Sequence, residues 1–109
     1  MTNFIDQLEL YGNSDYDIAA NIGHHFKDYR IALRLTQAQV AKQSGISVMT
    51  LVRFENGQGQ ALKLKNLIAL MRALQLLENI SDLIPEIPDS LYRSHKAPKQ
   101  RVRRKNNEE

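Results

Sequence analysis

A three-residue turn between two short helical segments constrains the fold of this chain more than any other feature. Thr36 is placed to cap the first segment, and Gln39 follows three residues later, which is the pattern of a capping box. Gly45 ends this segment, because glycine adopts the left-handed conformation of a helix C-terminus without strain. Ser47 then caps the second segment. Two such short helices, joined by so tight a turn, must cross at a steep angle.

The remaining sequence also has a helical period, and no run alternates as a strand would. We expect an all-α fold with five helices, at about 17–35, 37–44, 48–55, 64–74 and 78–84. A chain of 109 residues has room for one domain, which we place at 17–84. An N-terminal arm or short helix (1–16) precedes it, and a flexible basic tail (85–109) follows the first proline.

The apolar spacing predicts which faces point inward. Ile18, Ile22, Phe26, Tyr29 and Leu33 follow one another at three- and four-residue steps and should line the core face of the first helix. In the two short helices the predicted inward residues are Val40, Ala41, Leu51 and Phe54. The second short helix would then present Val48, Met49, Val52 and Arg53 outward, a shape that fits the major groove of DNA.

These residues resemble the helix-turn-helix domains of the Cro and phage-repressor (XRE) family. The resemblance covers about residues 18–84 and is carried by Thr36-Gln37-Ala38-Gln39-Val40-Ala41, Ser44-Gly45-Ile46-Ser47, Leu51, Phe54 and Glu55-Asn56-Gly57. It implies a lambda-repressor-like fold that binds double-stranded DNA. It assigns base or phosphate contacts to Gln37, Ser47, Val48, Met49, Val52, Arg53, Asn56, Gln58, Lys63 and Lys65, and a buried structural ion pair to Arg30 and Glu55.

The chain departs from many relatives at three positions. Val48 and Met49 stand where polar base-reading residues are common, and their apolar side chains favour contact with thymine methyl groups. Arg53 could contact guanine with two hydrogen bonds or clamp a phosphate. Lys63 occupies the N-cap of the fourth helix, where a lysine opposes the helix dipole. A DNA phosphate would explain that lysine, and tolerance of a small cost is the alternative.

Residues 61–84 hold more apolar side chains than one core face needs. If Leu64, Leu67, Ile68, Met71 and Leu74 face the core, three leucines remain for a dimer interface: Leu70, Leu77 and Leu83. A homodimer would set two recognition helices about 34 Å apart on an inverted-repeat operator. A different protein on the same surface is the alternative.

The tail carries a cluster of basic residues: Lys99, Arg101, Arg103, Arg104 and Lys105. We expect these side chains to contact DNA phosphates or a protein partner, the alternative being a solubilising role. This tail is also similar to that of DNA-binding antitoxins encoded beside HipA-type kinase toxins. The similarity implies a HipA-like kinase as a possible partner.

Other classes of function find little support in the sequence. The chain has no cysteine, and the adjacent His24 and His25 point about 100° apart on a helix, so we expect no metal and no cofactor. No enzyme motif, leader or membrane span is evident, which favours a cytoplasmic, nucleoid-associated protein. The prediction is a sequence-specific DNA-binding regulator that represses its own operon as an antitoxin. The alternative is a module that neutralises a partner protein through residues 61–109, with DNA binding secondary.

Overall fold

The structure, a computed structural model, describes residues 10–94 of the chain. Residues 10–12 are helical, and six helices follow: α2 (Asp15–Ala32), α3 (Gln37–Ser44), α4 (Val48–Glu55), α5 (Leu64–Ala73), α6 (Leu77–Ser81) and α7 (Asp89–Ser94). The described residues contain no strand, so the predicted all-α fold is confirmed. Most of the predicted arm, residues 1–9, lies outside the described part, as do Lys99, Arg101, Arg103, Arg104 and Lys105.

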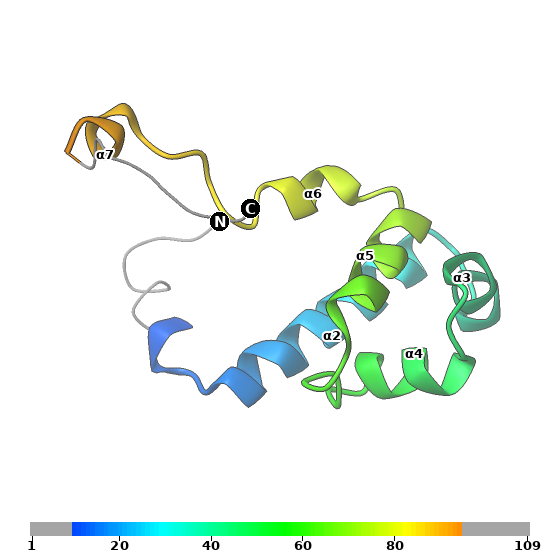
Figure 1. Cartoon of the computed structure of the whole chain (residues 1–109). Helices are drawn as coiled ribbons and strands as arrows, with labels where there is room; N and C mark the ends of the chain where they lie inside the picture. The colour runs from blue at the N-terminus through cyan, green and yellow to red at the C-terminus, as the bar shows by residue number, and fades with distance from the viewer. Residues whose placement is uncertain (1–9, 95–109) are drawn as a thin grey trace, which may run out of the picture.

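Helices α2 to α5 surround a single small core, with α6 beside the end of α5 (Figure 1). Helix α2 packs against α4, α3 packs against both α4 and α5, and α5 also meets α6. The buried apolar residues are Phe26, Val40, Ala41, Leu51, Phe54, Leu70 and Leu74. All four predicted inward residues of the two short helices belong to this core.

The two short helices begin and end where the sequence predicts, but the first helix is shorter than expected. It ends at Ala32 because Arg34 adopts a left-handed conformation, with φ 63°. The Arg34 and Leu35 amides donate to the carbonyls of Ile31 and Arg30, which is a Schellman motif. Gly45, Gly57 and Gln75 close α3, α4 and α5 in the same way, with φ of 74°, 90° and 60°.

The predicted inward face of the first helix is wrong at several positions. Ile22 and Tyr29 of α2 are exposed, as is its C-cap residue Leu33, whereas Gly23, Phe26 and Arg30 are buried. The prediction used the spacing of large apolar residues, and Gly23 and Arg30 are not among them. The buried face was therefore placed incorrectly. What turns Gly23 inward is the close approach of α4, described below.

Leu70 does not belong to a dimer interface. Its side chain is fully buried in the core. Leu64, which the sequence predicts on the core face of the same helix, is largely exposed. In so apolar a helix the sequence does not fix the rotation about the helix axis; packing against α3 turns Leu70 inward. Leu77 is half-buried and Leu83 is exposed, so both stay compatible with an interface.

The C-terminal end also differs from the prediction. The fifth helix, α6, spans only Leu77–Ser81 instead of continuing to residue 84. The segment after Pro85 contains α7, which the polar, proline-broken sequence did not indicate. Helix α7 lies apart from the bundle at the end of an extended segment (Figure 1).

Candidate nucleic-acid interface

Hydrogen bonds fix both the start of α3 and the turn between α3 and α4. Thr36 Oγ1 accepts from the Gln39 amide at 3.0 Å, and Gln39 Oε1 accepts from the Thr36 amide at 2.8 Å, completing the predicted capping box. The Ile46 amide donates to the Ala41 carbonyl at 3.2 Å across Gly45. The Ser47 side chain then accepts from the Thr50 amide at 3.0 Å. The start of α4 is therefore locked to the end of α3.

Helix α4 has a buried back and an open front. Leu51, Phe54 and Glu55 are buried on one side. On the other side Val48 and Met49 are 45% and 55% exposed, Arg53 is exposed, and Val52 is half-buried. The first turn of α4 thus projects apolar side chains into solvent from a helix held rigidly behind, which is how the recognition helix of a helix-turn-helix is presented to DNA.

Phe54 is held by contacts that the sequence pattern does not predict. Its ring packs against Phe26 with centroids 5.3 Å apart and an angle of 58° between the rings. A Cβ atom on Gly23 would lie only 1.9 Å from the Phe54 carbonyl oxygen, and one on Gly59 would lie 2.5 Å from the Phe54 ring. The two glycines therefore set the distance of α4 from α2 and from the loop that follows.

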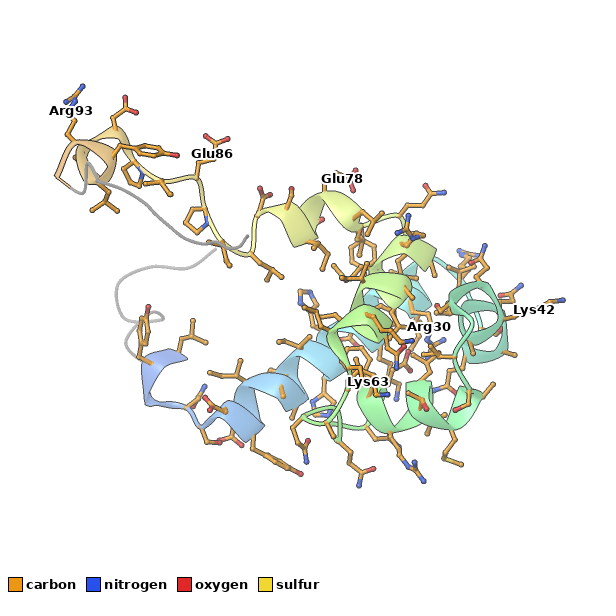
Figure 2. All side chains as sticks on the ribbon, viewed as in Figure 1. Arg30, Lys42, Lys63, Glu78, Glu86 and Arg93 are labelled. Carbon is orange, nitrogen blue, oxygen red and sulfur yellow. The ribbon has the colours of Figure 1, made fainter. Side chains whose placement is uncertain are left out.

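The ion pair between Arg30 and Glu55 lies inside the bundle. Arg30 Nε donates to Glu55 Oε2 at 2.7 Å and Arg30 Nη2 to Oε1 at 2.9 Å, a two-bonded fork. Arg30 Nη1 donates to the Leu35 carbonyl at 2.7 Å, just before α3. Figure 2 shows Arg30 pointing into the space between the helices. One guanidinium thus joins α2, the start of α3 and the end of α4.

Gln37 also belongs to this network. Its Nε2 donates to Glu55 Oε1 at 3.0 Å, and the side chain is half-buried. The resemblance implies only a DNA contact for Gln37, whereas its amide nitrogen has a partner within the protein. The amide oxygen has no protein partner among the hydrogen bonds of the described residues, so a contact with DNA is still compatible with this geometry.

The other predicted DNA contacts follow α4 closely in the chain. Asn56, Gln58, Lys63 and Lys65 are all exposed. Lys63 precedes α5 as its N-cap and makes no side-chain capping bond, as expected for lysine (Figure 2). Because a lysine cap satisfies none of the free amides of α5, that helix end is open to an anion.

The first turns of α3, α4 and α5 differ from those of the other helices in lacking acidic residues. The first turns of α2, α6 and α7 contain Asp15 and Asp17, Glu78, and Asp89, which suit the positive end of the helix dipole. The first turns of α3, α4 and α5 contain no acid. No carboxylate there would repel a phosphate, and this signal was present in the sequence.

Comparison with protein families agrees with this geometry. A family model described as Helix-turn-helix matches residues 26–78, from the middle of α2 into α6. Residues 26–78 thus resemble a helix-turn-helix domain. The match supports the resemblance to XRE-family regulators, and the matched family is one of DNA-binding regulator domains rather than of enzymes. No curated protein matches the chain.

Two absences concern the part of the chain that the structure describes, residues 10–94. In that part of the chain no group of three or more histidine, aspartate or glutamate side chains is arranged to hold a metal ion. None of its helices has the length and hydropathy needed to cross a lipid bilayer.

Proposed function

We propose that this helix-turn-helix domain is a sequence-specific transcription regulator that places α4 in the major groove of double-stranded DNA. The observation that carries the proposal is that α4 has two different faces. Leu51, Phe54 and Glu55 are buried on one face, and Val48 and Met49 are exposed on the other. A helix that reads base edges needs this rigidity, because a loosely held helix would not keep its side chains in register with the bases.

The exposed front of α4 determines what kind of sequence would be read. Val48 and Met49 offer no hydrogen-bond donor or acceptor, so they favour the methyl group of thymine. Arg53 supplies the positive charge on this face, either for a guanine edge or for a phosphate. Ser47 and Val52 flank these residues. We therefore infer an operator with thymine where the N-terminal turn of α4 enters the groove.

The surrounding residues supply the contacts that do not depend on sequence. Asn56, Gln58, Lys63 and Lys65 are exposed, and the starts of α3, α4 and α5 carry no acidic residue. Phosphates can therefore approach these helix ends without repulsion, and Gln37 lies at one of them. Contacts of this kind fix the position of a protein on the duplex while the base contacts select the sequence.

We further infer a homodimer that binds an inverted repeat and represses its own operon. Leu77 and Leu83 support the dimer, since one is half-buried and the other exposed beyond the core. The finer role, as the antitoxin of a HipA-like kinase, is supported only by the likeness of the basic tail. Co-purification of the neighbouring gene product with the full chain, and its loss when residues 86–109 are deleted, tests that role.

The DNA proposal is tested with the double variant Val48→Asp/Arg53→Ala. The probes are the DNA upstream of the chain's own gene and duplexes selected by the protein from a randomised pool. We expect the variant to lose at least about thirtyfold in affinity, since two contacts worth about 1–3 kcal/mol each are removed. Arg72→Asp changes the net charge by the same amount at the far end of α5 and should retain most of the affinity (Figure 1).

Two outcomes of this experiment would overturn the proposal. If the double variant binds the selected duplexes as tightly as the original chain, α4 is not the recognition helix. If the original chain selects no sequence and captures only the neighbouring gene product, the chain acts as a protein-interaction module instead.

A further inference from the structure

A mostly apolar groove lies between α2, α5 and α6. It has a volume of about 360 Å³ and is lined by Ile22, Phe26 and Tyr29 of α2, by Leu67 and Met71 of α5, and by Leu76 before α6. Ile22 and Tyr29 are 49% and 43% exposed, although both are large and largely apolar. Two polar residues, His25 and Asn79, complete the lining.

Within residues 10–94, a second apolar segment has large side chains that are mostly exposed. Leu83, Ile84, Ile87 and Tyr92 lie between the end of α6 and the end of α7, and between 55% and 83% of each is exposed. None of the extensive helix–helix contacts within residues 10–94 involves α7. We call residues 83–94 the C-terminal arm.

We propose that the C-terminal arm of one copy binds in the groove of a second copy, and that the exchange of two arms holds the dimer together. The chemistry of the two surfaces matches. Aliphatic side chains of the arm fit an aliphatic and aromatic lining, and the Tyr92 hydroxyl can pair with His25 or Asn79. The inference rests on the dimer of the proposed function but names its mode of association.

Geometry favours the groove of a second copy over the chain's own groove. Asn79, which lines the groove, is only four residues before Leu83, so the arm would have to turn back sharply to enter. Pro85 and Pro88 keep this stretch extended. The arm in fact leaves α6 in a direction away from α5 (Figure 1). If the arm of each copy binds in the groove of the other, both arms and both grooves are occupied and the assembly is a closed dimer.

The first test measures the oligomeric state of full-length variants by analytical ultracentrifugation. Ile84→Asp/Ile87→Asp alters the arm and Ile22→Asp/Tyr29→Asp alters the groove. Each should raise the dimer dissociation constant by at least about a hundredfold, since each removes two buried apolar side chains. Ile31→Asp is the matched control, because Ile31 is 53% exposed on the same helix but does not line the groove.

Mixing the two altered proteins separates arm exchange from other modes of association. The variant with the altered arm keeps an unaltered groove, and the variant with the altered groove keeps an unaltered arm. The mixture should therefore form a heterodimer with one intact arm–groove pair. If the original chain is monomeric, if the arm variant still dimerises normally, or if mixing restores nothing, the proposal is wrong.

A second test uses the absence of cysteine from the chain. The single variants Tyr29→Cys and Ile87→Cys, mixed and mildly oxidised, should give a disulfide-linked heterodimer. A double variant that instead forms only an internal disulfide would show that the arm folds back on its own groove and would overturn the proposal. Both tests are performed without DNA, so a failure of DNA binding would contradict the proposed function and leave the arm exchange intact.

Discussion

Gly23 of α2 lies directly against the backbone carbonyl of Phe54 in α4. A Cβ atom at Gly23 would come within 1.9 Å of that oxygen, far closer than any side chain permits. The two helices can therefore meet backbone to backbone only because position 23 has no side chain. This contact places the Phe54 ring next to Phe26 and fixes the rotation of α4, and with it the direction of Met49 and Arg53.

Gly23→Ala should destabilise the domain severely. The added methyl group forces α2 and α4 apart, and overpacking of this kind costs at least about 1–3 kcal/mol. Urea unfolding followed by circular dichroism measures the effect. Gly12→Ala is the control, because a Cβ there meets nothing within 4 Å, and its free energy of unfolding should change little. Equal effects of the two substitutions would contradict the close contact.

Glu55→Gln should destabilise the domain by about 3–5 kcal/mol, because it leaves the buried Arg30 guanidinium without a counter-charge. Thermal or urea unfolding measures this loss. Glu78→Gln, in the first turn of α6 and exposed, should change the stability far less. A Glu55→Gln protein that folds normally but fails to bind DNA would show that the pair acts in recognition rather than in folding.

Gln37→Ala separates the two roles of that glutamine. Loss of its hydrogen bond to Glu55 should cost about 1.5–3 kcal/mol of stability, as is usual for hydrogen bonds to charged groups. If Gln37 contacts DNA as well, the affinity for a selected duplex should fall further than partial unfolding accounts for. Unfolding curves and binding titrations on the same preparation give both values. Unchanged affinity of the folded fraction would leave Gln37 with a structural role alone.

Arg34→Gly and Gln75→Gly should each stabilise the domain. Both residues hold a left-handed conformation that costs a side-chain-bearing residue about 1–2 kcal/mol. Glycine removes that cost, and the greater freedom of the unfolded chain offsets part of the gain, so we expect about 0.5–1 kcal/mol. Lys42→Gly, inside α3, should instead lower the stability by about 1 kcal/mol. Destabilisation by all three would contradict the left-handed assignment.

Arg53→Ala and Lys63→Ala should each make DNA binding less dependent on salt. If each side chain neutralises one phosphate, the slope of log affinity against log salt should fall by about 0.9 per substitution. Titrations at several salt concentrations measure it. Arg72→Ala, at the end of α5 away from α4, should leave the slope unchanged (Figure 1). If Arg53 reads a guanine instead, its loss should also weaken the preference for that base.

The sequence by itself determined the helix-turn-helix unit. Its boundary signals are local: Thr36 with Gln39, Gly45 and Ser47 each act on backbone groups within a few residues. Such interactions operate in the same way whatever the rest of the chain does, so α3 and α4 begin and end where the sequence predicts. The buried residues of α3 and α4 could also be predicted from the sequence, because two short helices joined by a tight turn can pack in few ways.

Only the tertiary structure decided how the longer helices are rotated and where they end. Arg34 and Gln75 stop α2 and α5 without a glycine to mark the place, and the close approach at Gly23 turns Ile22 and Tyr29 outward. In α5, packing against α3 buries Leu70, which apolar spacing had assigned to the surface. These outcomes depend on contacts between segments distant in the chain, which no local pattern of residues encodes.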